Sequence, residues 1–197
     1  MSETLPDLTH AALLSMDLQT AIVSRYSGDQ PAFVARVRTL LHAAREHKVP
    51  VIHVQVGFRA GFPEISERNV LFGAIKTNPQ WQRMFQGAVS AIHPDVAPLG
   101  DEAVITKHRV SAFHGTDLEM ILRAQEIDTL ILCGIATSGV VLSTLLDASD
   151  ADYRVIVVKD CCLDNDLDVH ACLVEKVFPR RGTVLTADEL QPILAEK

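Results

Sequence analysis

The stretch that decides the fold is TLILCGIATSGVVLSTLLDASDADYRVIVVKD, residues 129–160. Residues 129–135 and 154–160 are apolar nearly throughout, which is typical of strands that are covered on both faces. Residues 140–150, which lie between them, are expected to form a helix. A strand, a helix and a second strand in this order predict two parallel strands joined by a right-handed crossover.

The same alternation continues on both sides of this unit. Further strands are expected at residues 11–17, 49–56, 103–107 and 182–186, and further helices at 31–48, 115–126, 166–178 and 187–197. The sequence therefore predicts a single domain over residues 1–197, an α/β fold of three layers (α/β/α) with a six-stranded parallel, Rossmann-like sheet. The Gly- and Pro-rich segment 57–102 is too long for a plain connection. We expect it to form an irregular excursion over one sheet edge, with a short helix around residues 81–85.

Composition narrows the classes of function. The chain has 197 residues and a net charge of −7, so it lacks the excess of basic side chains that nucleic-acid surfaces need. Its apolar runs are too short to cross a bilayer, and no secretory signal is recognised at the N-terminus. The four cysteines form no C-x-x-C pair, which is typical of reduced thiols in the cytoplasm. We therefore expect a cytoplasmic protein whose partners include neither nucleic acid nor a membrane.

Candidate catalytic residues follow from where ligands bind in open parallel sheets, at the carboxyl ends of the strands. Asp17 ends the first expected strand and Lys107 ends the third. A neighbouring ammonium group favours an ionised carboxylate whereas burial favours the neutral acid, and the balance can place proton transfer near the working pH. The competing interpretation is that each charge caps a loop or forms a solvated ion pair.

The turn after residues 129–135 is the second candidate. A tight turn that leads into a helix presents backbone N–H groups and the positive end of the helix dipole, which together stabilise an anion. The alternative is an ordinary strand-to-helix turn in which Ser138 is the N-cap.

These segments resemble the isochorismatase-like hydrolase superfamily, which includes nicotinamidases, N-carbamoyl amidases and isochorismatases. The resemblance runs through ALLSMDLQ (12–19), ITKHRVSAFHGTDLEMIL (105–122) and CGIATSGVVLSTLLDASDADYRVIVVKDCC (133–162). It implies that Asp17 and Lys107 are catalytic. It also implies a cis peptide between Ile135 and Ala136, with the amides of Ala136 and Val140 as oxyanion donors.

One position departs from the family pattern G-x-x-T-x-x-C-V. The chain keeps Gly134 and Thr137, but Val140 stands where the family has its nucleophilic cysteine. The resemblance therefore implies a member that lacks the usual thiol, as the true isochorismatase branch does. That branch cleaves a vinyl ether with the aspartate as acid. A relocated thiol among Cys133, Cys161 and Cys162, or a silent member that only binds a metabolite, are the alternatives.

Metal ligands and further pocket residues were sought in the remaining segments. Some nicotinamidases resembling this chain bind zinc or iron through several histidines after the second strand. This region has a single histidine, His53, which lies within the strand and is more often a hydrogen-bonded core or face residue than a ligand, so no metal and no cofactor are expected. Arg59, Trp81, His108 and His114 are candidates for lining the pocket. Arg59 would bind a carboxylate in a bidentate manner, or is a solvated loop arginine. Trp81 would cover the site, or anchor the long segment.

Taken together, these residues predict a hydrolase. We expect it to act on a small, anionic metabolite through acid–base chemistry of Asp17 and Lys107, without a cysteine nucleophile. The substrate-binding residues are expected to be Ile135, Ala136, Thr137, Val140, Arg59, Trp81 and His114. Because members of the superfamily commonly associate, the resemblance also implies a homo-oligomer.

Overall fold

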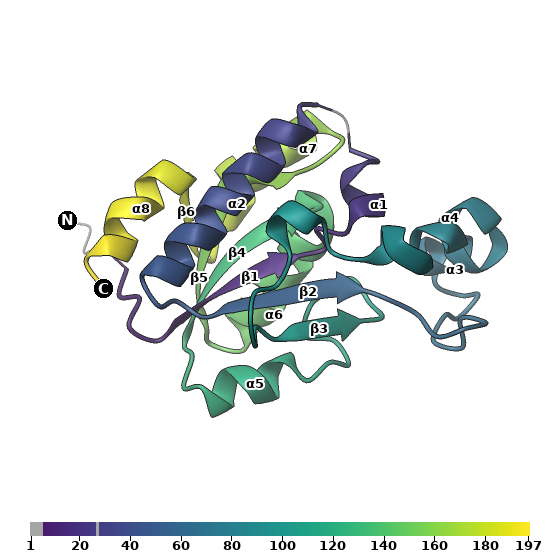
Figure 1. Ribbon diagram of the computed structural model, residues 1–197, viewed down its shortest axis with the longest axis horizontal. Coiled ribbons are helices and arrows are strands. Elements are labelled where there is room, and N and C mark those ends of the chain that lie inside the picture. Colours follow the sequence, from purple (N-terminus) through teal and green to yellow (C-terminus); the bar gives the residue numbers. More distant parts are fainter. Residues whose placement is uncertain (1–5, 27) are drawn as a thin grey trace.

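The structure is a computed structural model that describes residues 6–26 and 28–197. Six parallel strands form one sheet in the order β3-β2-β1-β4-β5-β6 (Figure 1). The strands are β1 (Ala11–Met16), β2 (Val51–Val56), β3 (Val104–Lys107), β4 (Thr129–Ile135), β5 (Arg154–Leu163) and β6 (Thr183–Leu185). The predicted six-stranded parallel sheet and its α/β class are confirmed.

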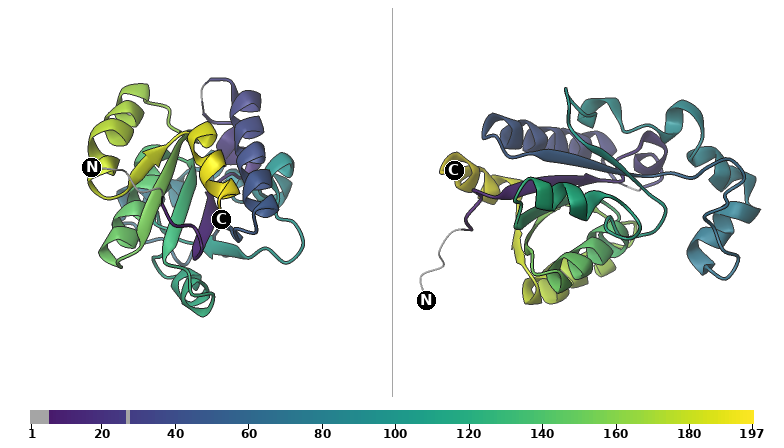
Figure 2. Two further views of the ribbon diagram at one scale, coloured as in Figure 1. Left: turned by 90° about the vertical axis from the view of Figure 1, so that its left-hand side faces the viewer. Right: turned by 90° about the horizontal axis from the view of Figure 1, so that it is seen from below.

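Helices cover both faces of the sheet (Figure 2). They are α1 (Thr20–Val23), α2 (Gln30–Glu46), α3 (Val70–Thr77), α4 (Pro79–Met84), α5 (Leu118–Ala124), α6 (Leu142–Asp150), α7 (Leu167–Cys172) and α8 (Ala187–Ala195). One core lies under α2 and α8, and a second core lies under α5, α6 and the segment that follows α7. Every residue of β1 and β4 is buried, because these central strands are covered on both faces.

The carboxyl ends of β1 and β4 lie side by side, and there the strand order reverses. Met16 pairs with Gly134 in this register. Gly134 has a φ of +139°, and a Cβ at this position would collide with the carbonyl group of Met16. Only glycine therefore allows the two strand ends to approach so closely at the point where a ligand site is expected.

The first part of the segment 57–102, with α3 and α4, extends beyond the carboxyl ends of the strands (Figure 1), which corrects the expected path over one sheet edge. It contains α3, which the sequence did not predict, and α4, which lies close to the short helix expected at 81–85. The side chains of Asn69 and Asn78 cap these helices. The reason for the path is a third apolar cluster beyond β2, formed by Val56, Phe62, Ile65, Phe72 and Ile75.

Gln19 fastens this segment to the sheet. Its buried side chain donates to the carbonyl groups of Val56 and Ser90 at 3.0 and 2.7 Å, and it accepts from the Val56 N–H at 2.9 Å. The return path continues through short 3-10 turns at Gly87–Ser90 and Pro94–Val96 and reaches β3. Within the described part of the chain, the helices are all too short or too polar to span a bilayer.

Candidate active site

Asp17 and Lys107 form a buried ion pair at the carboxyl ends of β1 and β3. Lys107 Nζ lies 2.8 Å from Asp17 Oδ2 and also donates to the Arg109 carbonyl group at 3.1 Å. The two residues are only 6% and 2% exposed, respectively. The competing interpretation, that each charge caps a loop or forms a solvated ion pair, is therefore wrong, because the pair is buried.

The protonation of Asp17 reflects two opposing influences. Burial raises the pKa of Asp17, the positive charge of Lys107 lowers it, and the net direction is upward. Asp17 Oδ1 is buried and has no hydrogen-bond partner among residues 6–26 and 28–197, whereas Oδ2 faces Lys107. Oδ1 is therefore the oxygen that is left to carry or transfer a proton.

A cavity of about 470 Å³ opens over this pair. The sheet contributes Asp17, Val56, Lys107 and Ile135, and the turn after β4 contributes Ala136 and Val140. The segment 57–102 closes the other side with Trp81 and other apolar side chains. Six of the residues expected at the site thus lie around one cavity: Asp17, Lys107, Trp81, Ile135, Ala136 and Val140.

The turn after β4 brings polar groups to the same cavity. The peptide bond between Ile135 and Ala136 is cis. Ser138 lines the cavity, and its N–H and Oγ donate to Asp164 Oδ2 at 2.8 and 2.6 Å. Ser138 is therefore held by a carboxylate at the end of β5, and its hydroxyl oxygen can still accept a hydrogen bond from a ligand.

Comparison with known proteins identifies this arrangement. Residues 11–189 match the family described as the isochorismatase domain. The chain belongs to the isochorismatase family. Its members are hydrolases, and the chain is accordingly assigned as a hydrolase of unknown substrate.

Three relatives illustrate the family match. The maleamate amidohydrolase of Pseudomonas putida is 30% identical over 83% of this chain and 75% of its own. The isochorismatase family protein YecD of Escherichia coli O157:H7 is 31% identical over 91% and 93%. The structure of an isochorismatase family protein from Burkholderia thailandensis superposes with a TM-score of 0.86 at 30% identity, covering 98% of this chain and 100% of that one.

Thr137, which was expected to bind the substrate, does not line the cavity. It is completely buried, and its Oγ1 lies 2.8 Å from His170 Nδ1. Burial lowers the pKa of His170, so the imidazole is neutral near pH 7. The pair therefore joins the turn to α7, which corrects the expectation that Thr137 contacts the substrate.

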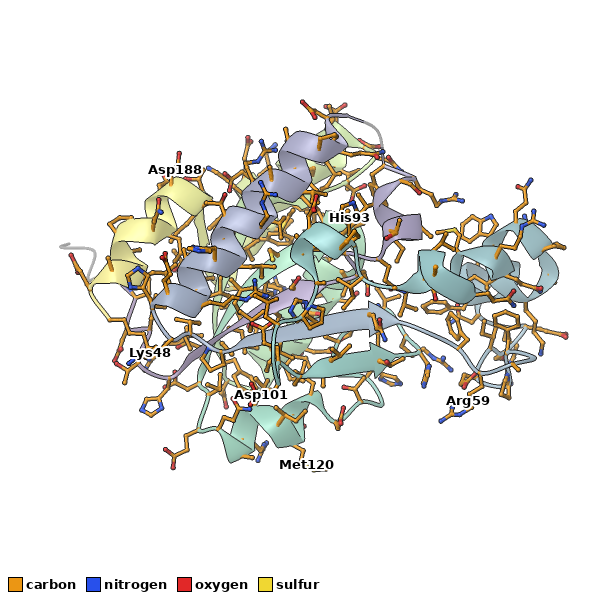
Figure 3. All side chains as sticks on the ribbon, in the orientation of Figure 1. Lys48, Arg59, His93, Asp101, Met120 and Asp188 are labelled. Carbon is orange, nitrogen blue, oxygen red and sulfur yellow. The ribbon has the colours of Figure 1, made fainter. Side chains whose placement is uncertain are left out.

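Arg59 and His114 also lie away from the cavity. Arg59 forms an ion pair with Glu64 at 2.5 Å, and its exposed side chain lies at the periphery in Figure 3. It borders a separate, polar hollow, together with His108, whose Nδ1 lies 2.6 Å from the Gly57 carbonyl oxygen. His114 is exposed after β3. The sequence misplaced these residues because loop direction depends on contacts that are distant in the chain.

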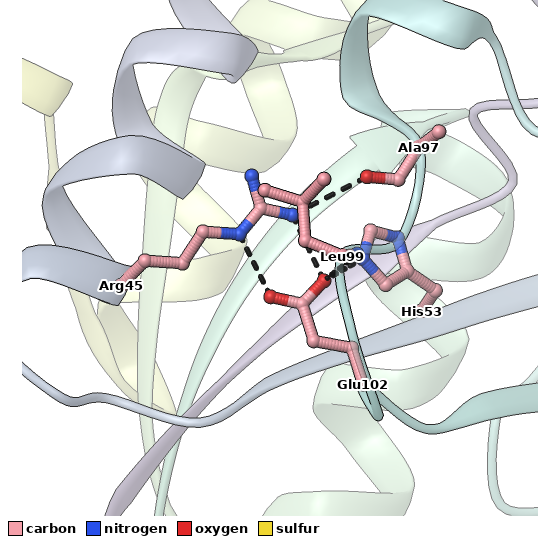
Figure 4. Close-up of polar contacts among 5 residues, drawn as sticks. All are labelled: Arg45, His53, Ala97, Leu99 and Glu102. Carbon is pink, nitrogen blue, oxygen red and sulfur yellow. Dashed lines mark hydrogen bonds and ion pairs between the residues drawn. The ribbon is translucent and has the colours of Figure 1, made fainter.

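His53 is a hydrogen-bonded core residue, as the sequence suggested. Its Nε2 lies 3.0 Å from Glu102 Oε2, and Arg45 donates to both oxygens of the same carboxylate at 2.7 and 2.9 Å (Figure 4). Burial alone would raise the pKa of Glu102, but hydrogen bonds from Arg45, the Leu99 N–H and His53 outweigh it and lower the pKa to about 2. This network joins α2 to the segment that precedes β3.

The cysteines are placed unfavourably for a nucleophilic role. Cys133, Cys161 and Cys162 are buried, and burial raises the pKa of each thiol, to about 12 for Cys162. Cys172 is exposed. None of the four belongs to the cavity lining in the described part of the chain, and no cluster of His, Cys, Asp and Glu suited to a metal is found there.

Sequence reasoning missed Arg25, Tyr26 and Asp164. Arg25 and Tyr26 line the cavity from the segment after α1, a helix too short to show a periodic pattern. Burial and the nearby carboxylates of Asp164 and Asp17 raise the pKa of Tyr26 to about 12, so its hydroxyl group stays protonated. The available signal was position alone, because all three residues follow the carboxyl ends of β1 or β5.

Proposed function

We propose that this isochorismatase-family hydrolase acts on a small, anionic metabolite through acid–base chemistry of Asp17 and Lys107, without a cysteine nucleophile. The observation that carries the proposal is the 2.8 Å pair of Asp17 and Lys107, buried at one side of a cavity whose wall includes Val140. A valine side chain has no nucleophilic atom. The acid and the ammonium group are then the pair at the base of the cavity that is proposed to act on the substrate.

The thiols support this route by their positions. The three buried cysteines have raised pKa values, so little reactive thiolate is present at neutral pH. Relocated thiol catalysis would require one of them to reach the cavity. The Cys133 Sγ instead donates to the Leu14 carbonyl group inside the sheet at 3.6 Å.

Acid-catalysed cleavage of an enol ether suits the remaining groups. Protonated Asp17 gives its proton to the terminal alkene carbon, and an oxocarbenium ion forms. Water adds to the cationic carbon, which is bonded to the ether oxygen, and loses a proton to the Asp17 carboxylate, which restores the acid. The resulting hemiketal then releases the alcohol and a ketone, so no covalent enzyme intermediate is needed. The raised pKa of Asp17 favours the acid form that the first step consumes.

Lys107 and the turn would hold charge during this sequence. When Asp17 loses its proton, Lys107 stabilises the carboxylate at 2.8 Å. The amides of Ala136 and Val140 are proposed to bind a negatively charged oxygen of the substrate. The Ser138 hydroxyl group, which donates to Asp164, would accept a hydrogen bond from the attacking water.

Amide hydrolysis is a second candidate function. It is favoured by the 30% identity to the maleamate amidohydrolase of P. putida. In this chain water would have to attack the amide directly, because the described cavity wall contains no thiol. A member that binds a metabolite without turnover is the third possibility. The expectations of a homo-oligomer and of a cytoplasmic location remain predictions.

A substrate panel separates these functions. The chain would be incubated with enol-pyruvyl ethers, primary amides and carbamoyl compounds, while pyruvate, ammonia and the melting temperature are followed. The proposal expects product from at least one class. Stabilisation without any product would indicate a binding protein instead.

Two variants then test the chemistry. We expect Asp17→Asn to abolish turnover, and replacement of all four cysteines by alanine or valine to retain it. Asp150→Asn, on the exposed end of α6, is the matched control for loss of one carboxylate. Turnover by Asp17→Asn, or its loss in a folded cysteine-free variant, would contradict the proposed mechanism.

A further inference from the structure

The wall of the cavity is mostly apolar, and its charged groups are few. Its apolar surface comes from α1, β2, α3, α4 and the turn after β4, through residues such as Ile22, Val56, Phe72, Ile75, Trp81 and Phe85. Two cations belong to the described lining, Lys107 and Arg25. Lys107 is buried and paired with Asp17, whereas Arg25 is exposed to solvent. Arg25 therefore lies at the mouth of the cavity and the ion pair lies at its base.

Neutral groups hold the Arg25 guanidinium in place. Its carbon Cζ lies 4.8 Å from the centre of the Trp81 ring, and Nη1 donates to Met84 Sδ at 3.5 Å. Both partners are on α4, so Arg25 connects the segment after β1 to the helix on the other side of the mouth. Stacking on an aromatic face orients a guanidinium without neutralising its charge.

Of the two cations in the described cavity lining, Lys107 has a carboxylate partner and Arg25 has none. Among residues 6–26 and 28–197, no Asp or Glu oxygen lies within 4 Å of its guanidinium nitrogens, whereas four other arginines have such a partner. The four are Arg45, Arg59, Arg123 and Arg154. Arg25 thus keeps several N–H donors for a ligand, and an arginine presents them in the planar arrangement that suits a carboxylate.

We propose that Arg25 is a specificity-determining residue, which binds a carboxylate on the part of the substrate remote from the reacting bond. The substrate class is an amphipathic carboxylate whose apolar body, of about the size of one ring, lies between Arg25 and the Asp17–Lys107 pair. This inference rests on the proposed function for the position of the reacting bond. It assigns the role expected of Arg59 to a different arginine.

Two further observations support this class. The volume of about 470 Å³ lies in the lower part of the range for small-molecule sites, so a ring with a short chain fills it. Lys107 is buried and already directs its N–H groups to Asp17 and to the Arg109 carbonyl group, so a remote carboxylate is attracted to the exposed Arg25 rather than to the base of the cavity.

Trp81 makes the test direct, because it is the one tryptophan in the sequence and lines the cavity beside Arg25. Its fluorescence would be titrated with 3-phenylpropanoate and with the neutral 3-phenylpropanamide, and calorimetry would confirm each dissociation constant. The probes have the same apolar body and differ in charge. We expect the carboxylate to bind about tenfold more tightly, the effect of one good charge-assisted interaction.

Variants test whether Arg25 causes the preference for the carboxylate. We expect Arg25→Gln to abolish the preference for the carboxylate while binding of the amide changes by less than about twofold. Arg25→Lys should retain part of it, since the charge remains and the planar arrangement is lost. Arg68→Gln is the matched control, because Arg68 is an exposed arginine in the segment 57–102 and lies outside the cavity lining.

Each outcome decides the inference. Equal titration curves for the two probes in the natural protein, including no response to either, would overturn it, as would a preference that survives in Arg25→Gln. These measurements involve no turnover. A chain that shows the Arg25-dependent preference but hydrolyses nothing would refute the proposed function and leave the inference intact.

Discussion

Replacing Lys107 by methionine should destabilise the protein in a manner that depends on pH. Methionine retains most of the side-chain volume but removes the charge 2.8 Å from Asp17 Oδ2. At an effective dielectric constant of about 20, that distance corresponds to an attraction of about 6 kcal/mol. Desolvation of two buried ions offsets much of this energy, so the loss of one partner is expected to cost about 3–5 kcal/mol at neutral pH.

The pH dependence follows from the direction in which the pKa of Asp17 is shifted. Burial already raises it above 3.8 in the folded protein, and Lys107 acts in the opposite direction. Removing Lys107 raises it further, so the folded variant binds a proton that the unfolded chain releases. The free energy of unfolding then falls by about 1.4 kcal/mol per pH unit between the unfolded and folded pKa values. Destabilisation is therefore small near pH 4 and grows as the pH rises.

Urea unfolding followed by circular dichroism measures this effect at pH 5 and pH 8. We expect the difference between the natural protein and Lys107→Met to be larger at pH 8 by at least about 1.4 kcal/mol, which is the equivalent of one pH unit. In an Asp17→Asn background the additional pH dependence should disappear. Destabilisation of equal size at both pH values, or a pH dependence that persists without Asp17, would refute the reasoning.

Three other perturbations have defined outcomes. Glu102→Gln should lower stability by about 1–3 kcal/mol at pH 7. Because the Glu102 pKa is lowered to about 2, this contribution is present above pH 4.5 and is lost as the pH falls towards 2. The melting curves of the variant and the natural protein should therefore converge in acid. Gly134→Ala should cost more than about 2 kcal/mol in urea unfolding, since its Cβ would meet the Met16 carbonyl group, and near-natural stability would contradict that packing. A thiol reagent should label Cys172 in the native protein and the three buried cysteines only after unfolding, and mass spectrometry would show any early labelling of Cys133 that speaks against its burial.

Much of the fold could be predicted because the relevant information is local. Apolar runs at β1, β4 and β5 indicate strands that are covered on both faces, and the helices between them imply parallel pairing. Asp17 and Lys107 were found in the same way, since Asp17 directly follows β1 and Lys107 is the last residue of β3. By contrast, α1 has four residues, too few to show a helical period.

The partners of polar side chains could not be predicted to the same degree. Ser138 and Asp164 are 26 residues apart, and Thr137 and His170 are 33 apart. Such pairs depend on where loops lie after the sheet has formed, and a loop direction has no period in the sequence. Arg59 illustrates the limit, because its ion pair with Glu64 holds it outside the cavity.

By itself, the sequence determined the layered parallel sheet and the strand ends where its acid and its ammonium group stand, because burial imposes a repeating pattern along each strand. The tertiary structure alone decided that these two charges form a buried ion pair, and that Arg25 rather than Arg59 lies at the mouth of the cavity. The physical reason is that the energy of a charge depends on its distance to other charges and to water, and folding sets both between residues far apart in the chain.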